Sequence, residues 1–216
     1  MLSIDLTNNP MCLRLKKCFL KGKTMQYIDG IEHYQNTKPT AITLGKFDGL
    51  HQGHELLIER VIHHQKESDV DGVVFAFDMS PLYKKLGKEP DFLLTNRQKA
   101  KRLEGRISYF VDCPFEESIS RMSAMDFISE VLVKRFHAKY IIVGTDFRFG
   151  FQKQGDYKML QQYGDMYGYQ VEVIEKKVYN GQEISSTYIK QELQKGNEEL
   201  VDLLLGYKYS EIKKTF

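Results

Sequence analysis

Short apolar runs and stretches with apolar residues at helical spacing alternate along the chain from Thr40 onward. The first run, at 41–44, is apolar enough for a strand that is buried on both faces. The stretch that follows it, at 55–65, places its leucine, valine and isoleucine residues at the spacing of one helix face. Because strand and helix patterns keep alternating, we expect βαβ units and an α/β fold with a doubly wound, mostly parallel sheet.

The same pattern predicts the other elements. Further strands are expected at 72–77, 108–111, 139–143 and 169–174. Helices are expected at 95–103 and 127–136, where Thr95 and Ser123 begin capping boxes, and at 156–167, which Gly168 ends. The pair Asn180-Gly181 predicts a hairpin turn. Two short helices follow: the first is capped by Thr187 or Ser186 and ends at Gly196, and the second is capped by Asn197 and ends at Gly206.

Length and composition favour one main domain. The chain has 216 residues, of which 42% are hydrophobic and 28% are charged, enough for one good core. The net charge of +2 is too small to indicate nucleic acid, and basic residues are not interleaved with aromatic ones. Because the sequence has no run of about 18 apolar residues, we expect no membrane span.

The cysteines and the amino end bear on location. Cys12, Cys18 and Cys113 are odd in number and lack metal-ligand spacing, which favours free thiols and a cytoplasmic location. The first residues are basic, without the apolar core and cleavage site of a signal peptide. We expect residues 1–24 to be a disordered extension or an incorrectly assigned start, with translation beginning at Met25, and residues 25–216 to form the domain.

The segment Gly45–His54, GKFDGLHQGH, carries the strongest functional signal. It lies between the first strand and the first helix, where free backbone N–H groups favour an anion and glycines let a phosphate approach closely. His51 and His54 are three residues apart, so both imidazoles, neutral or cationic, can donate hydrogen bonds to one phosphoryl oxygen. A lone histidine here is more often a packing or capping residue, but two of them bracketed by Gly49 and Gly53 predict a phosphate site.

GKFDGLHQGH resembles the first motif of the FMN adenylyltransferase module of bacterial bifunctional riboflavin kinase/FAD synthetases, which belong to the HxGH nucleotidyltransferase superfamily. VGTDFRFG at 143–150 resembles that family's central glycine-aromatic motif, and ISSTYIK at 184–190 resembles its second phosphate motif. LLTNRQKAKRL and MSAMDFISEVL match the intervening helices. The resemblance covers residues 25–207.

The resemblance implies a Rossmann-like sheet of the HxGH type and the conversion of FMN and ATP, with Mg²⁺, into FAD and pyrophosphate. It implies catalytic roles for His51, His54 and Lys190. The residues it implies for ATP and its phosphates are Gly45, Phe47, Asp48, Gly49, Gly53, Gly144, Asp146, Ser185, Ser186 and Thr187. Those it implies for the flavin are Phe77, Ser80, Pro81, Phe147 and Phe149. The metal ligands and the oligomeric state stay open.

Several of these residues have a structural alternative. Asp48 could orient the metal or a histidine, or could form the local turn. Phe147 and Phe149 could be core residues, although they follow a buried strand at the edge where ligands bind in α/β sheets. The basic segment Tyr83, Lys84, Lys85 and Lys88 is expected to be a solvated loop more than a flavin-phosphate contact. The remaining histidines, His33, His63, His64 and His137, are expected at the surface.

The chain departs from the family pattern in three places. It reads Asp78-Met79-Ser80-Pro81 where the family has a Pro-His-Pro turn, which removes an imidazole from the flavin side. It has Lys190 where the family has arginine, so a point charge replaces a bidentate fork. It stops at Phe216, where a riboflavin kinase domain would begin, so we expect no phosphorylation of riboflavin.

Two other functions remain open from the sequence. The chain could be another HxGH adenylyl- or cytidylyltransferase with a different phosphorylated acceptor. It could also be a degenerate relative that binds flavin or nucleotide without turnover, an alternative that Ser80 and Lys190 keep open. Long similarity favours FMN as the acceptor.

Overall fold

The computed structural model describes residues 24–213. Within that range, six parallel strands form one sheet in the order β1-β4-β3-β2-β5-β8. These strands are β1 (Gln26–Asp29), β2 (Thr40–Gly45), β3 (Asp71–Asp78), β4 (Tyr109–Pro114), β5 (Ala138–Gly144) and β8 (Gln170–Ile174). Two small antiparallel pairs lie outside it: β6 (Arg148–Phe149) with β7 (Gly155–Asp156), and β9 (Val178–Tyr179) with β10 (Gln182–Glu183). The predicted doubly wound parallel sheet is confirmed.

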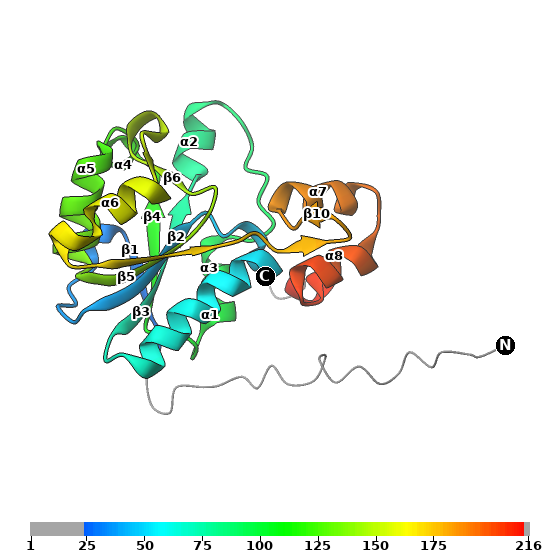
Figure 1. Ribbon diagram of the computed structural model, residues 1–216. Helices are drawn as coiled ribbons and strands as arrows, with labels where there is room; N and C mark the ends of the chain where they lie inside the picture. The colour runs from blue at the N-terminus through cyan, green and yellow to red at the C-terminus, as the bar shows by residue number, and fades with distance from the viewer. Residues whose placement is uncertain (1–23, 214–216) are drawn as a thin grey trace.

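Helices cover both faces of the sheet (Figure 1). They are α1 (Gln52–Glu67), α2 (Ser80–Lys85), α3 (Asn96–Leu103), α4 (Glu117–Ser120), α5 (Ala124–Asp126), α6 (Tyr157–Tyr167), α7 (Ser186–Gln194), α8 (Glu198–Leu205) and α9 (Tyr209–Lys213). Three 3₁₀ turns, η2 (Ile31–His33), η3 (Asp48–Leu50) and η5 (Phe151–Lys153), and a π-helix, η4 (Phe127–Arg135), complete the described part. In that part no helix is long and apolar enough to cross a membrane.

Alternate residues along each strand face two separate cores. Ile42 and Phe75 pack with η4 and α6 on one face, whereas Ala41 and Val74 pack with α1 and α3 on the other. Figure 1 shows α5 and α6 on the opposite side of the sheet from α1 and α3. The central strands are therefore apolar on both faces, which explains why they appear in the sequence as continuous apolar runs.

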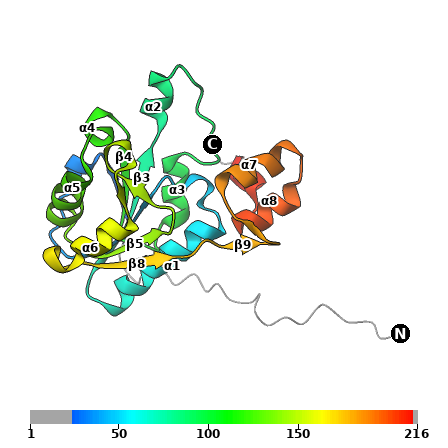
Figure 2. The same ribbon diagram turned by 45° about the horizontal axis from the view of Figure 1, so that its top comes forward.

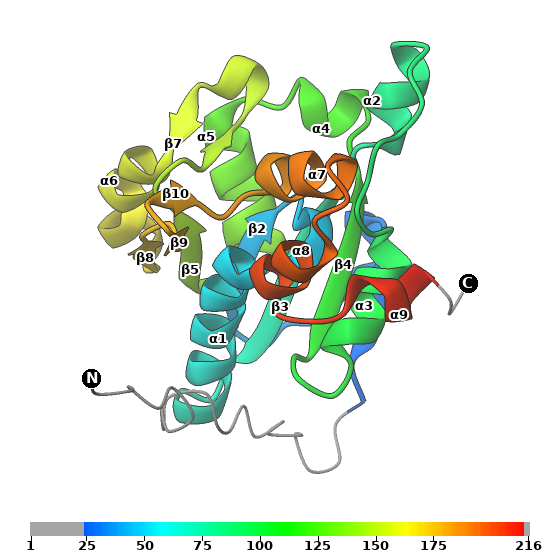
Figure 3. The same ribbon diagram turned by 90° about the vertical axis from the view of Figure 1, so that its right-hand side faces the viewer.

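The carboxyl ends of β2 and β5 mark the point where strand order reverses. From β2 the chain moves through β3 to β4 on one side, and β5 then returns to the other side of β2. In open α/β sheets, ligands bind at this topological switch point. Two further features border the same end: the hairpin β9–β10, which leads from β8 to α7 and α8, and α2, which projects beyond β3 (Figures 2 and 3).

Several helix ends differ from the sequence prediction. Ser185, and neither Ser186 nor Thr187, caps α7, because its side chain accepts the N–H of Tyr188 at 3.2 Å. Asn197 makes no side-chain cap for α8, because its amide donates to the Glu192 carboxylate at 3.0 Å. In contrast, the capping box at Thr95 and the hairpin at Asn180-Gly181 are confirmed.

The helix predicted at 127–136 exists but has a wider turn. Ser123 caps α5, and the chain continues as the π-helix η4, where the N–H of Phe136 bonds to the carbonyl of Val131, five residues back, at 3.0 Å. Apolar periodicity does not distinguish an α-helix from a π-helix here, because Phe127 and Val131 would be buried in either type. The strand β1 and the helix α2 were not predicted from the sequence at all.

Two predictions about single residues also need comment. His64 is buried, with its ring stacked on Tyr140 and hydrogen-bonded to Glu172, so the prediction of a surface histidine is wrong there. The other three of that set, His33, His63 and His137, are exposed. Cys113 is a free, buried thiol whose pKa is raised to about 12 by burial. Cys12, Cys18 and the amino extension at 1–23 lie outside the described residues.

Replacing Gly150 with alanine is expected to destabilise the protein by about 3 kcal/mol. Gly150 has φ of +74°, and a methyl group there would lie 2.7 Å from the backbone N and Cα of Ala124. Gly168→Ala is the matched control, because its φ is +75° but nothing lies within 4 Å of the added methyl. That control should cost only about 1 kcal/mol in urea unfolding. Equal losses in the two variants would contradict the close-contact explanation.

Candidate active site

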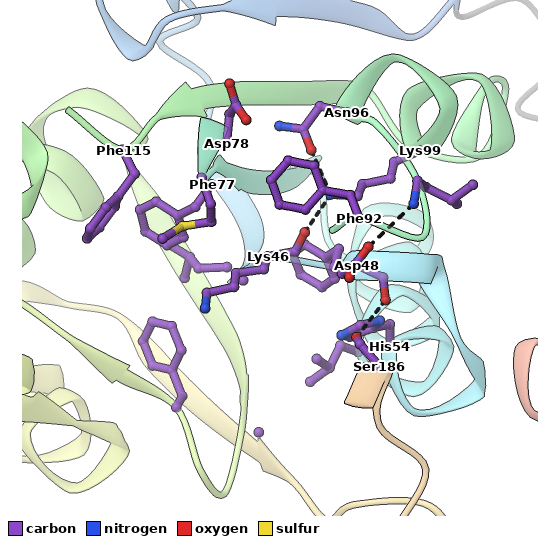
Figure 4. Close-up of a pocket in the computed structure, with 18 of the residues that line it drawn as sticks. Lys46, Asp48, His54, Phe77, Asp78, Phe92, Asn96, Lys99, Phe115 and Ser186 are labelled. Carbon is purple, nitrogen blue, oxygen red and sulfur yellow. Dashed lines mark hydrogen bonds between the residues drawn. The ribbon is translucent and has the colours of Figure 1, made fainter. Parts of the chain in front are cut away.

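A cavity of about 1100 Å³ lies at the carboxyl end of the sheet, at the switch point (Figure 4). Most of the residues predicted for the site line it: Gly45, Phe47, Asp48, His51, Gly53, His54, Phe77, Ser80, Gly144, Asp146, Phe147, Phe149, Ser185, Ser186, Thr187 and Lys190. Gly49 and Pro81 do not line it. Gly49 instead shapes the turn, with φ of +83°, and Pro81 lies in the first turn of α2.

The first motif forms a compressed turn between β2 and α1. Phe47 and Leu50 both have positive φ, at 49° and 42°, and Phe47 is almost fully buried. Such backbone conformations are sparsely populated for non-glycine residues and persist only where packing fixes them. The turn directs the first residues of α1 into the cavity, and His51 and His54 belong to this part of the helix.

His51 and His54 stack, with ring centroids 3.6 Å apart. The Nδ1 atom of His51 accepts the backbone N–H of His54 at 3.4 Å, so His51 caps α1 and carries its proton on Nε2. The Nδ1 atom of His54 is buried and has no hydrogen-bond partner among the described residues. Buried polar atoms without a partner are uncommon in folded proteins, so this imidazole is an unusual feature of the helix start.

Burial keeps both imidazoles neutral. It lowers the pKa of His51 to about 4 against the opposing effect of Asp48, and it holds the pKa of His54 well below the ordinary value, with help from His51 and Lys99. The sequence left open whether the rings are neutral or cationic. Their environment makes them neutral hydrogen-bond donors.

Because His51 is neutral in the folded protein, we expect the free energy of unfolding to fall in acid. Because the unfolded chain binds protons below about pH 6.5 and the folded His51 does not until about pH 4, its contribution is full above pH 6.5 and is lost as pH falls towards 4. By pH 5 the loss from His51 should reach about 2 kcal/mol. His51→Asn keeps a capping side chain, so urea unfolding at pH 7 and 5 should show a smaller acid loss than in the parent chain. An unchanged loss would contradict the assignment.

The second predicted phosphate motif lies directly against the first, and both line the cavity. The Ser186 hydroxyl donates to the main-chain carbonyl of Asp48 at 2.8 Å, which ties the start of α7 to the first-motif turn (Figure 4). Thr187 is exposed beside it. The Nζ atom of Lys190, one turn further on, lies 3.0 Å from the Asp48 carboxylate and 3.5 Å from that of Asp91. The two predicted helix starts therefore meet at one place.

Asp48 joins three segments. Its Oδ1 atom accepts the backbone N–H of Leu93 at 2.7 Å, and its Oδ2 atom pairs with Lys190. Burial opposes the charge of Lys190, but the hydrogen bond and the ion pair with Asp48 outweigh it and raise the Lys190 pKa. Both carboxylate oxygens of Asp48 therefore already have partners, the Leu93 N–H and the Lys190 ammonium group. Asp48 fixes the position of the Lys190 ammonium group.

The described residues contain no cluster of three or more His, Cys, Asp or Glu side chains suited to a metal ion. Asp48, which the sequence raised as a metal-orienting residue, already has its carboxylate oxygens engaged. The described residues therefore offer no ready-made cage of protein ligands for Mg²⁺. Mg²⁺ is commonly held by one or two carboxylates together with phosphate oxygens and several waters.

Aromatic side chains form the other wall of the cavity. Phe77 and Phe115 make an edge contact at 5.8 Å between ring centroids, and Phe147 stacks on Phe149 at 5.6 Å. Both rings line the cavity, but Phe149 is a buried core residue and Phe147 is half-buried, so the core and site interpretations of this pair both apply in part. A flat apolar ring system would find both faces and edges to pack on here.

In the altered turn after β3, the side chain of Ser80 hydrogen-bonds to a residue of the same segment. The Ser80 hydroxyl donates to the Asp78 carboxylate at 2.6 Å. In the basic segment that follows, Tyr83 lines the cavity, whereas Lys84 and Lys85 are exposed and do not. The lysines are exposed to solvent as expected, but Tyr83, Lys84 and Lys85 belong to helix α2, so the prediction of a loop is wrong for this segment.

Sequence reasoning missed a polar group on α3 and β4. Lys99, Asn96 and Asp112 line the cavity, and Asn96 hydrogen-bonds to both of the others, to Asp112 through its amide nitrogen. The one available signal was Lys99 itself, a charged residue on the face of α3 that also buries Ala100 and Leu103. A lysine at a buried helix position is unusual enough to mark a site.

The fold and the site define an α/β protein of the doubly wound class, with a two-histidine turn at the switch point of the sheet. Residues 33–188, well over half of the chain, match the family profile described as FAD synthetase. The chain belongs to the FAD synthetase family, as the sequence motifs predicted.

Curated relatives agree. The chain is 32% identical over 190 residues to the bifunctional riboflavin kinase/FMN adenylyltransferase of Escherichia coli K12. This match covers 86% of this chain and 61% of that protein. It is 32% identical over 189 residues to the protein of the same name from Buchnera aphidicola of Acyrthosiphon pisum, with 86% and 60% covered. The chain thus spans about 60% of the length of these relatives.

A solved structure shares the fold. A crystal structure described as a macrolide-efflux protein from Streptococcus pneumoniae superposes with a TM-score of 0.70 over 85% of this chain and 62% of that one. At 24% sequence identity, this likeness supports the fold alone.

Proposed function

We propose that this protein is an FMN adenylyltransferase that transfers AMP from MgATP to FMN and releases pyrophosphate. The observation that carries the proposal is the meeting of two helix starts at the switch point, one bearing His51 and His54 and the other Lys190, beside an aromatic wall. Membership of the FAD synthetase family, and curated relatives named as FMN adenylyltransferases, support the same reaction.

The reaction asks for positioning and for stabilisation of charge. An oxygen of the FMN phosphate attacks the α-phosphorus of ATP, a new P–O bond forms, and the bond to the departing pyrophosphate breaks. The neutral imidazoles of His51 and His54 donate hydrogen bonds to phosphoryl oxygens as negative charge develops. Lys190 neutralises the pyrophosphate, and the start of α7 offers backbone N–H groups and the Thr187 hydroxyl.

On the acceptor side, the aromatic wall is proposed to hold the flavin ring. Phe77 and Phe147 present ring surface to the cavity. Ser80 supplies no imidazole, and its hydroxyl is occupied by Asp78. Flavin binding therefore depends on stacking more than on a hydrogen bond from this turn.

Incubation of the protein with FMN, ATP and Mg²⁺ should yield FAD and pyrophosphate in equal amounts, measured by chromatography and a coupled pyrophosphate assay. Omitting Mg²⁺ should abolish both, because the metal shares the charge of the transition state. Turnover of a different phosphorylated acceptor in place of FMN would overturn the proposed substrate.

A second candidate, a binding protein without turnover, is favoured by the engagement of Ser80 with Asp78 and by the presence of Lys190 in place of arginine. It would show tight FMN or ATP binding with no product. In that case the double variant Ser80→His, Lys190→Arg should recover activity if those two departures caused the loss.

We also propose that residues 25–216 make up one nucleotidyltransferase domain and that the protein acts in the cytoplasm. The domain proposal is supported by β1, which starts at Gln26 and pairs with β4 along its length. The cytoplasmic proposal rests on the cysteines of the sequence, which are odd in number and lack metal-ligand spacing.

A further inference from the structure

Lys99 is a charged residue on the buried face of α3, and it has no role in the reaction as proposed above. It is only 4% exposed, yet it lines the same cavity as His54. Lysine is almost never fully buried unless its charge is compensated. Its position therefore calls for a physical reason.

The ammonium group of Lys99 hydrogen-bonds to the backbone at the start of the first-motif turn. It donates to the main-chain carbonyl of Lys46 at 2.8 Å and to Oδ1 of Asn96 at 2.8 Å (Figure 4). Lys46 immediately precedes Phe47, the first residue with positive φ in the turn. An ammonium group has three N–H donors, and contacts with described residues occupy two of them.

The charge of Lys99 is finely balanced by its surroundings. Burial disfavours the charged form most strongly and Lys190 on α7 adds to that effect, whereas Asp48 on the turn, Asp112 on β4 and Asp78 on β3 favour it. The outcome is a pKa lowered to about 8. Without a ligand, Lys99 therefore begins to lose its proton just above neutral pH.

We propose that Lys99 is a positioning residue of the phosphate site: it fixes the first-motif turn through the Lys46 carbonyl and takes up a proton when a phosphate group binds at that turn. The physical reason is that a bound anion favours the charged form of a nearby buried amine. This inference rests on the proposed function for one point only, that the phosphate ligand is MgATP.

Proton uptake can be measured directly by titration calorimetry with MgATP in two buffers of different ionisation enthalpy. At about pH 8.5 the parent chain should take up about half a proton per MgATP bound, and at about pH 6.5 close to none, because Lys99 is then already charged. His51 stays neutral and Lys190 stays charged across this interval, since their pKa values are lowered and raised respectively.

Lys99→Met should abolish the uptake at about pH 8.5 and weaken MgATP binding at least tenfold. Lys101→Met, the matched control, replaces an exposed lysine two residues further along the same helix and should leave both unchanged. Lys99→Gln provides a second variant that keeps an N–H donor for the Lys46 carbonyl. It should retain more affinity than Lys99→Met and equally lack the proton uptake.

Undiminished uptake in Lys99→Met or Lys99→Gln overturns the proposal. If neither variant folds, the parent chain decides: affinity for MgATP that is constant between about pH 7 and 9 also overturns it. Proton uptake without formation of FAD would leave this inference standing and defeat the proposed reaction. Formation of FAD without proton uptake would overturn this inference and leave the proposed reaction standing. An absence of MgATP binding would overturn both the inference and the proposed reaction.

Discussion

Replacement of His54 by alanine is expected to reduce turnover about a hundredfold or more while weakening ATP binding much less. The imidazole is neutral, stacks on His51 and has a buried Nδ1 atom without a partner among the described residues. A donor of this kind contributes most when negative charge builds up on a phosphoryl oxygen. Steady-state rates together with calorimetric ATP affinities would separate the two effects.

His63→Ala is the appropriate control for this variant. His63 lies on the same helix, α1, but is exposed and does not line the cavity. It should keep both turnover and ATP affinity. If His54→Ala loses binding and turnover to the same extent, His54 has a ground-state or structural role, and thermal unfolding of the variant would show which.

Replacement of Lys190 by methionine is expected to lower kcat/KM about a hundredfold or more. The change removes the cation that faces the phosphates and leaves the Asp48 carboxylate, only 12% exposed, without its ion pair. That carboxylate would then repel the incoming phosphates, so the two effects add. Initial rates over a range of ATP concentrations would measure the loss.

Two comparisons make the Lys190 prediction specific. Lys190→Arg should retain or raise activity, because a guanidinium fork can pair with Asp48 and a phosphate in fixed geometry. Asp91→Asn should have little effect, since the Asp91 side chain is 79% exposed and its carboxylate lies 3.5 Å from Nζ. A severe loss in Lys190→Arg would mean that the second motif has been assigned to the wrong place.

The sequence identified this site because its chemistry is local. GKFDGLHQGH and ISSTYIK each combine a helix start with residue types suited to phosphate, and a helix start is determined by neighbours a few residues away. The central strands were equally clear, because burial on both faces makes them continuously apolar. The family followed from these same short segments.

Features that depend on distant residues were not available in this way. The cap of α7 was assigned to the wrong hydroxyl because Ser186 is occupied by the carbonyl of Asp48, 138 residues away in the chain. Asn197 makes no side-chain cap for α8 because its amide reaches Glu192 instead. His64 appeared to be a surface residue until Glu172 and Tyr140 were brought beside it.

By itself, the sequence determined the central strands, most of the long helices, the two motifs at the helix starts and the family, since each is encoded by residues close together in the chain. Only the tertiary structure decided that Asp48 holds Lys190, that both histidines of the first motif are neutral, and that Lys99 lies behind their turn. The physical reason is that charge state and ion pairing depend on burial and on neighbours from other elements. Those neighbours meet only where the strands of a parallel sheet end together.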